Sequence, residues 1–282
     1  MLRESVYVIP RRVFDARLVA AAVARGVVLR RHRVRRVAPG PGRVELDGEL
    51  AAAVLIGADG AESTVRRQLG VSLSGPGRTA VAIRAYAPDL PGRADRQLIA
   101  MSRRGWPAYA WSFPTGSGRS NVGFGQLVGD RPPTRAELLA GLRALLPDLG
   151  DDLTDVRGHR LPLSPGRPRV GNGRVLLAGD ALSLINPLSG EGIYYAIRSG
   201  MLAADAATAG AGAGRRYREL LHRRLGRHLR HTAVLSAAIG RWPALVDAGV
   251  AAARRRAGPF DDLVDLALGE GLITARLLRA LR

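Results

Sequence analysis

The sequence predicts a three-layer α/β domain that is interrupted by an inserted antiparallel sheet and followed by a helical tail. Two continuous apolar segments, 51–57 and 174–178, are typical of strands that are buried on both faces of a parallel sheet. Between them lie short segments in which apolar and polar residues alternate, separated by turn residues, as in an antiparallel sheet. Because one parallel-type strand precedes this sheet and another follows it, we expect the sheet to be an insertion.

The N-terminal part is predicted to supply a strand, a helix, a second strand and a hairpin. Residues 4–9 have the composition of a short strand, and 14–24 have the apolar spacing of a helix that ends near Gly26. Residues 27–37 alternate in polarity as a strand does. Residues 38–50 contain a Pro-Gly and an Asp-Gly turn, which are typical of hairpins.

The inserted sheet is expected to contain strands at 80–86, 96–101, 107–113 and 119–126. A helix at 134–146 interrupts it, because apolar residues at helical spacing gather on one side there. These residues are Leu138, Leu139, Leu142, Leu145 and Leu146.

The strand at 174–178 leads into a helix at about 190–207, and the Gly-rich segment 210–214 is expected to be a flexible link into a helical tail. The chain therefore divides into four regions. Residues 1–77 and 166–209 form the two parts of the α/β domain, 78–165 form the antiparallel domain, and 210–282 form the helical C-terminal region.

The composition excludes several classes of protein. All 43 basic residues are arginine and the formal net charge is +19, but the arginines are spread along the chain and aromatic residues amount to 5%, so we expect no nucleic-acid partner. The absence of cysteine excludes disulfides, iron–sulfur ligation and cysteine-based zinc sites. His228 and His231 share a helical face, which we interpret as a solvated basic surface and not as a metal site.

The first motif that carries chemistry is the string Gly57-Ala-Asp59-Gly60-Ala-Glu-Ser63-Thr-Val-Arg66, which follows an apolar strand. Glycines allow a ligand to approach the backbone closely, and a carboxylate at the end of a strand can accept hydrogen bonds from ligand hydroxyls. Ser63 has the right type and position to cap the helix that follows. For the whole string after a buried strand, a binding role outweighs the alternative of an ordinary Asp-Gly turn.

The second motif is Gly179-Asp180-Ala181 followed by Asn186-Pro187-Leu188-Ser189-Gly190-Glu191-Gly192-Ile193. An apolar strand again delivers an aspartate, and a Pro/Gly-rich turn then begins a helix. The N-terminus of a helix offers unpaired N–H groups and a partial positive charge, which suit a heteroaromatic edge that gains negative charge on reduction. The alternative is a loop with small residues for helix packing.

Together these strings resemble the two internal FAD signatures of the aromatic-hydroxylase-like flavoprotein superfamily, and NPLSGEGIYYAIRSG is most similar to the geranylgeranyl reductase family. Two further segments resemble elements of that family. They are RRVFDARL, starting at Arg11, and YAWSFP from Tyr109 followed by NVGFG from Asn121. The resemblance covers roughly residues 5–210 and implies an FAD/NAD(P)-binding domain with an inserted substrate-binding sheet.

The resemblance also implies the roles of individual residues. Asp180, beside Gly179, would hold the ribityl hydroxyls of FAD, and Arg11 would lie near its pyrophosphate or ribityl group. The residues near the isoalloxazine would be Pro187, Gly190, Glu191, Gly192 and Ile193. Asp59 and Gly60 would lie near the cofactor. Tyr109, Trp111 and Phe113 would line the substrate cavity, but their i, i+2, i+4 spacing fits core packing of a sheet equally well.

The resemblance implies an FAD-dependent oxidoreductase that reduces C=C bonds of a polyprenyl or similar apolar substrate by hydride transfer from reduced flavin. NAD(P)H or ferredoxin would supply the electrons. Alternatives are an FAD-dependent hydroxylase of the same fold, or a non-catalytic remnant whose basic tail binds a membrane surface. A halogenase is disfavoured because the chain has no lysine to hold an activated halogen.

One departure from the family is large. Its members begin with a strand–GxGxxG–helix unit that binds the FAD diphosphate, and no such unit is found here. We therefore expect an N-terminal nucleotide-binding segment to be missing and the affinity for FAD to be weakened. Because no apolar run is long enough to span a bilayer and no signal peptide is found, we expect a cytoplasmic protein, with peripheral membrane contact as the alternative.

Overall fold

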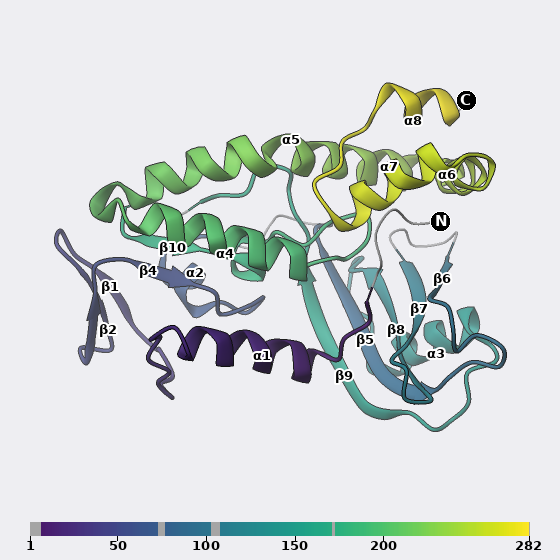
Figure 1. Ribbon diagram of the computed structural model, residues 1–282, viewed down its shortest axis with the longest axis horizontal. Coiled ribbons are helices and arrows are strands. Elements are labelled where there is room, and N and C mark those ends of the chain that lie inside the picture. The colour runs from purple at the N-terminus through teal and green to yellow at the C-terminus, as the bar shows by residue number, and fades with distance from the viewer. Residues whose placement is uncertain (1–6, 73–76, 103–107, 171–172, 282) are drawn as a thin grey trace.

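The computed structural model describes residues 7–72, 77–102, 108–170 and 173–281 (Figure 1). It confirms a mixed α/β fold with an inserted antiparallel sheet and a helical C-terminal region. Strands β4 (Leu55–Gly57) and β10 (Val175–Leu177) pair in parallel, although the whole antiparallel sheet lies between them in the sequence. In the view of Figure 1, helices α4 (Ile193–Ala207) and α5 (Ala213–Arg241) lie on one side of this pair and α1 (Arg11–Val23) lies on the other.

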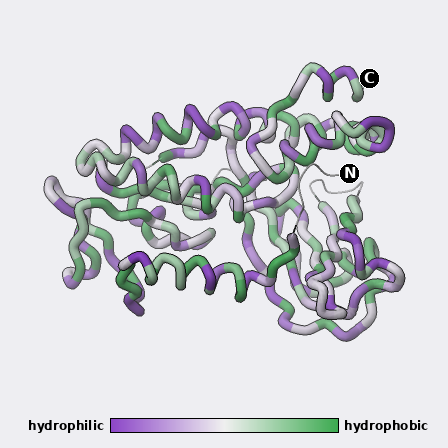
Figure 2. The backbone as a smooth tube through the Cα atoms, viewed as in Figure 1, coloured by the Kyte–Doolittle hydropathy of each residue, from purple (hydrophilic) through white to green (hydrophobic). Residues whose placement is uncertain are grey.

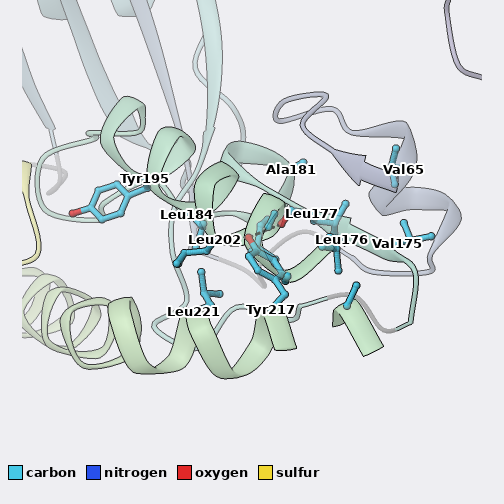
Figure 3. Packing of buried hydrophobic residues seen from close by; sticks show 14 of the residues in the cluster. Val65, Val175, Leu176, Leu177, Ala181, Leu184, Tyr195, Leu202, Tyr217 and Leu221 are labelled. Carbon is cyan, nitrogen blue, oxygen red and sulfur yellow. Dashed lines mark hydrogen bonds between the residues drawn. The ribbon is translucent and has the colours of Figure 1, made fainter. Parts of the chain in front are cut away.

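The core of the α/β part is built around β10, all three residues of which are buried. Its side chains pack against those of α4 and α5, among them Leu202, Tyr217 and Leu221 (Figure 3). In Figure 2 the α5 tube alternates between hydrophilic and hydrophobic segments, and the buried positions recur at helical spacing. The leucines of the arginine-rich tail therefore face the protein core.

The inserted sheet has five strands in the order β6-β7-β8-β5-β9. Their bounds are β5 Thr79–Pro88, β6 Leu98–Met101, β7 Ala108–Pro114, β8 Arg119–Leu127 and β9 Thr154–Pro162. All neighbouring strands pair antiparallel. The four predicted strands are confirmed, and β9 is an additional edge strand that the sequence pattern did not single out.

Helix α3 (Arg135–Leu145) covers one face of this sheet. Thr134 and Glu137 form a capping box at its N-terminus, in which the Thr134 Oγ1 accepts from the Glu137 N–H and the Glu137 carboxylate accepts from the Thr134 N–H. Leu138, Leu142 and Leu146 are buried against the sheet, as their spacing predicted.

The N-terminal predictions are partly wrong. Helix α1 is confirmed, but residues 7–9 and 27–36 form no strand, and residues 4–6 lie outside the described part of the chain. The hairpin region forms a three-stranded sheet of β1 (Val37–Pro39), β2 (Val44–Leu46) and β3 (Leu50–Ala52), with the predicted Asp47-Gly48 turn at positive φ. The apolar run at 51–57 is therefore divided between two sheets, since β3 ends and β4 begins within it.

The tail contains α5, α6 (Ala244–Arg255), α7 (Ala257–Leu268) and α8 (Ala275–Ala280), as predicted in type. The prediction of a flexible link is wrong, because Gly210–Gly212 form a 3₁₀ turn that runs directly into α5 at Ala213. Within the described ranges, no single helix is long and apolar enough to cross a membrane, and only α5 and α6 taken together, bent by 117°, meet both criteria.

Leu142 is fully buried between α3 and the inserted sheet. We predict that Leu142→Ala lowers the free energy of unfolding by about 2–5 kcal/mol, because the substitution loses transfer free energy and leaves a cavity. Urea denaturation measures this. Arg135→Ala, on the exposed side of the same helix, is the control and should change stability by no more than about 0.5 kcal/mol. Equal effects of the two variants would contradict this packing.

Candidate functional site

The two aspartate motifs meet because their strands are parallel neighbours. Leu177 lies opposite Gly57 in the register, and the Ala178 N–H donates to the Gly57 carbonyl at 3.0 Å. Both strands therefore end at the same edge of the pair, and the Asp59 and Asp180 loops leave it next to each other. In parallel sheets this edge is where ligands bind.

The carboxylate of Asp59 is occupied within its own motif. It accepts from the Ser63 hydroxyl, from the Thr64 N–H at 2.7 Å and from the Val65 N–H at 3.1 Å, all at the start of α2 (Thr64–Gln68). The Ser63 Oγ in turn accepts from the Arg66 N–H at 2.9 Å, so the predicted serine cap is confirmed. Asp59 shapes this loop, and its role toward a ligand remains a prediction.

Arg66 joins the two motifs and was not singled out from the sequence. Its side chain is 3% exposed, and its guanidinium donates to the Ala61 carbonyl at 2.6 Å and to the Ala181 carbonyl at 3.3 Å. Burial lowers the pKa of this arginine. Through these two bonds Arg66 ties the second loop to the first. In the sequence it is the last residue of the first motif string, where it was given no role of its own.

The carboxylate of Asp180, unlike that of Asp59, is not occupied by hydrogen bonds from the described residues of its own motif. In the described parts of the chain, no N–H or O–H group donates to its carboxylate, which lies in the 3₁₀ turn Gly179–Leu182. Burial raises the pKa of Asp180, the charge of Arg11 lowers it, and that of Glu191 raises it. A half-buried carboxylate with free acceptor positions suits a ligand that offers hydroxyl groups.

Gly179 and Gly192 allow a close approach at this carboxylate. Gly179 has φ +57° and a backbone N–H that donates to the Ser199 hydroxyl at 2.9 Å. A Cβ atom at Gly192 would lie 3.4 Å from the Asp180 Oδ1. The side chain of Arg11 is exposed and forms an ion pair with Asp15 at 2.9 Å, one turn along α1.

Residues 186–192, which we call the cofactor loop after the role that the family resemblance implies, form a closed turn in front of α4. The Asn186 N–H donates to the Glu191 carbonyl at 2.8 Å, and the Gly190 N–H donates to the Asn186 carbonyl at 2.9 Å. Pro187 is buried, and Gly190 has φ +71°. The Glu191 carboxylate accepts from the Tyr194 N–H at 2.8 Å and so caps α4, which begins at Ile193.

Tyr109, Trp111 and Phe113 form a row on one face of β7. The alternate residues of this strand are buried against α3, whereas the three aromatic side chains are half-buried on the opposite face. The ring centroids are 5.9 Å apart for Tyr109 and Trp111, and 6.5 Å apart for Trp111 and Phe113. The interpretation as the core of the sheet is thus disfavoured, because the core lies on the other face.

Gly123 provides the space that the row requires. It lies opposite Trp111 in the β7–β8 register, and a Cβ atom there would lie 2.1 Å from the Trp111 Cζ2. The Trp111 Nε1–H donates to the Asn121 Oδ1 at 2.8 Å, so the polar end of the indole is satisfied.

One contact joins the aromatic row to the cofactor loop. The Tyr109 hydroxyl donates to the Ser189 carbonyl. A Cβ atom at the neighbouring Gly190 would lie 2.8 Å from the Tyr109 Oη. Burial, with a contribution from the charge of Glu191, raises the pKa of Tyr109 to about 12, so this phenol stays protonated and keeps donating at neutral pH.

His228, which lies behind the cofactor loop, was misassigned from the sequence. His228 is 1% exposed, donates to the Gly271 carbonyl and is hydrogen-bonded to the Tyr195 hydroxyl, so the interpretation as a solvated basic face is wrong for this residue. The reason is its place on the buried stripe of α5, where it follows Tyr217, Leu221 and Leu225 at helical spacing. In the described ranges, no group of acidic and histidine side chains could hold a metal ion.

No model of a known protein family matches the chain. It is 32% identical over 221 residues to menaquinone reductase of Mycolicibacterium smegmatis, an alignment that covers 72% of this chain and 54% of that protein. It is 31% identical over 221 residues to digeranylgeranylglycerophospholipid reductase 2 of Methanopyrus kandleri, covering 71% and 55% respectively. The chain thus spans about half the length of the curated relatives it matches.

Solved structures define the fold class. A geranylgeranyl bacteriochlorophyll reductase-like protein of Thermoplasma acidophilum superposes with a TM-score of 0.73 at 21% identity, over 100% of this chain and 75% of that one. The anhydrotetracycline hydroxylase OxyS of Streptomyces rimosus superposes with a TM-score of 0.60 at 23% identity, over 92% and 56%. The chain therefore has the fold of FAD-dependent oxidoreductases. Its sequence relatives within that fold are reductases, which supports the family resemblance.

Position 190 requires glycine for two reasons: its backbone is left-handed, and a side chain there would meet the Tyr109 hydroxyl. We predict that Gly190→Ala lowers the free energy of unfolding by about 1–2 kcal/mol for the left-handed backbone alone, with a further loss because the Tyr109 hydroxyl must move. Gly200→Ala is the matched control, since Gly200 lies within α4 with open space around its Cβ position. It should raise stability by about 0.5–1 kcal/mol. Thermal unfolding measures both, and destabilisation by Gly200→Ala of the same size would contradict the argument.

Proposed function

We propose that the chain is the flavin-binding and substrate-binding part of an FAD-dependent reductase that acts on C=C bonds of a polyprenyl or similar apolar substrate. The observation that carries the proposal is the contact of Tyr109 with Ser189, since it sets the aromatic row of the inserted sheet directly against the cofactor loop. The names of the relatives, which are reductases of menaquinone and of a digeranylgeranyl lipid, support this class of substrate.

The residues present fit FAD. The Asp180 carboxylate, which has free acceptor positions, would accept hydrogen bonds from the ribityl hydroxyls, and Gly179 and Gly192 leave room beside it. The cofactor loop from Pro187 to the start of α4 at Ile193 would lie along the isoalloxazine, where the positive end of the helix favours added negative charge. When bound, FAD supplies the hydride chemistry.

Other predicted cofactor residues have more distant roles in the proposal. Arg11 would meet the charged part of FAD, because its positive charge already reaches the Asp180 site. Asp59 and Gly60 would shape the neighbouring loop, and Glu191 would cap α4 at the flavin edge.

The aromatic row would bind the apolar substrate. Tyr109, Trp111 and Phe113 offer a continuous apolar face next to the cofactor loop, and apolar walls exclude water from a hydride transfer. NAD(P)H or ferredoxin would supply the electrons. The hydroxylase alternative shares the fold, as OxyS does, but no contact in the site favours it over the reductase.

We also propose that a further polypeptide segment completes the FAD site. None of the described residues of α1 is buried, and the residues that follow it expose three consecutive apolar side chains, Val27, Val28 and Leu29. The outer face of α4 exposes Ile193, Ile197 and Met201. An isolated pair of parallel strands with uncovered helices around it has the surface of an incomplete α/β domain.

Any contact with a membrane surface would use the arginines of α5 and not its leucines. Leu221, Leu225 and Leu229 lie in the protein core, whereas arginines such as Arg223 and Arg224 are exposed. Such contact would be electrostatic and would weaken with salt.

We predict that Asp180→Ala weakens FAD binding at least about tenfold, because the ribityl hydroxyls lose a charged acceptor. Fluorescence quenching of FAD on titration measures this. The wild type and the Asp180→Ala variant should each be tested in the chain as given and in a chain extended by its upstream codons. Asp151→Ala, at a highly exposed carboxylate remote from the loops, is the matched control and should leave FAD binding unchanged.

Comparing the chain as given with the extended chain tests the proposed flavin site separately from the proposed completing segment. Binding by the extended chain alone supports a completing segment. Failure of the extended chain to bind FAD, or equal binding by Asp180→Ala and Asp151→Ala, would contradict the proposed flavin site. With flavin bound, consumption of menaquinone or of a geranylgeranyl lipid under reducing conditions tests the class of reaction.

A further inference from the structure

The cofactor loop is held from behind by the C-terminal end of α7. The last carbonyl groups of a helix have no partner within the helix, so they must be satisfied from outside. Here the loop satisfies them. The Asn186 Nδ2 donates to the Leu266 carbonyl at 2.8 Å, and the Ser189 hydroxyl donates to the Ala267 carbonyl at 2.5 Å.

The orientation of the Asn186 amide is defined by its other contacts. Its Oδ1 accepts from the Leu188 N–H at 2.9 Å, so its Nδ2 is the end that points at α7. The same Nδ2 donates to the Tyr195 hydroxyl at 3.0 Å. Asn186 is fully buried, so each of these bonds would be costly to lose.

Tyr195 and His228 extend the connection to α5 and to the segment after α7. The Tyr195 hydroxyl lies 2.7 Å from the His228 Nε2 and 2.8 Å from the Gly269 carbonyl, and the His228 Nδ1 lies 2.7 Å from the Gly271 carbonyl. The two rings stack with centroids 5.5 Å apart. Tyr195 and His228 are both fully buried, so water does not compete for these bonds.

The carbonyl of Gly271 determines the tautomer of His228. A carbonyl only accepts, so the proton of a neutral imidazole must lie on Nδ1. The Nε2 atom is then an acceptor, and it shares the single proton of the Tyr195 hydroxyl with the Gly269 carbonyl. Burial lowers the pKa of His228 and so does the charge of His231, whereas the Gly271 carbonyl and Glu270 raise it. The net direction is downward, which keeps the ring neutral at neutral pH.

We propose that Tyr195 and His228 are positioning residues that lock the cofactor loop to the C-terminal end of α7, so that the C-terminal helices set the geometry of the loop. The inference deepens the proposed function, because it takes loop 186–192 as the flavin loop. Tyr195 acts through the Asn186 amide, which also bonds to α7, and His228 acts through Tyr195.

The test measures amide hydrogen exchange in the full chain without cofactor. The reporters are the N–H groups of Asn186, Leu188 and Gly190, each of which is hydrogen-bonded within the loop. Tyr195→Phe and His228→Gln should each raise their exchange rates about tenfold relative to amides of the inserted sheet.

Tyr217→Phe is the matched control. Tyr217 is also fully buried and also donates to a backbone carbonyl, that of Leu177 at 2.9 Å, but it lies on α5 and bonds to β10 instead of the cofactor loop. It should leave the three reporter amides unchanged. Equal effects of all three variants, or no effect of Tyr195→Phe and His228→Gln, would overturn the proposal.

A second measurement needs no variant. The ¹⁵N shifts of the His228 ring in the wild-type chain should show the neutral tautomer with its proton on Nδ1. A neutral ring with its proton on Nε2 would overturn the lock, because Nδ1 would then have no proton to donate to the Gly271 carbonyl. Titration with FAD tests the proposed flavin site independently of the proposed role of Tyr195 and His228. A chain that shows the lock but binds no FAD, even when extended, contradicts the flavin site and leaves the lock established.

Discussion

The parallel pairing of β4 with β10 is the constraint on which the rest of the structure depends. These short strands are separated by the whole inserted sheet in the sequence, yet their register places Gly57 opposite Leu177. A shift of register would separate the Asp59 and Asp180 loops and would break the bridge that Arg66 makes from Ala61 to Ala181. Because all three residues of β10 are buried in the cluster that also contains the apolar side chains of α4 and α5, the pairing is supported by the largest core of the described residues.

From this pairing the site is assembled by contacts between distant segments. The inserted sheet reaches the cofactor loop through Tyr109, and the C-terminal helices reach it through Asn186, Tyr195 and His228. The loop is therefore held from two sides, with its glycines and the Asp180 carboxylate left for a ligand. An arrangement of this kind separates the rigid support from the groups that are free to bind.

Much of this arrangement is visible in the sequence. The alternating strands of the inserted sheet and the leucine face of α3 have strong periodicity, and the structure confirms them. Of the two apolar runs, 174–178 contains the buried strand β10 as predicted, whereas 51–57 does not form one continuous strand. The spacing of the motifs also predicted that Ser63 caps a helix. Family resemblance supplied the candidate cofactor residues, whose roles remain predictions.

Other features follow from tertiary contacts that no local pattern encodes. The apolar run 51–57 is divided because its two halves pair with different strands, β2 and β10. The glycine-rich segment 210–214 is ordered because a 3₁₀ turn at Gly210–Gly212 runs directly into α5, whose first residues Ala213 and Gly214 are buried. His228 looks like a member of a basic face until the buried stripe of α5 is followed through Tyr217, Leu221 and Leu225.

The central claim is that the Asp59 and Asp180 loops form one flavin site. The most direct measurement is an FAD titration of the isotopically labelled protein, extended by its upstream codons, followed by amide NMR. The amides of Gly60, Asp180 and Gly190 should respond with one common Kd, and that of Gly141 on α3 should not respond. Responses in only one loop, or different Kd values for the two loops, would contradict a single site.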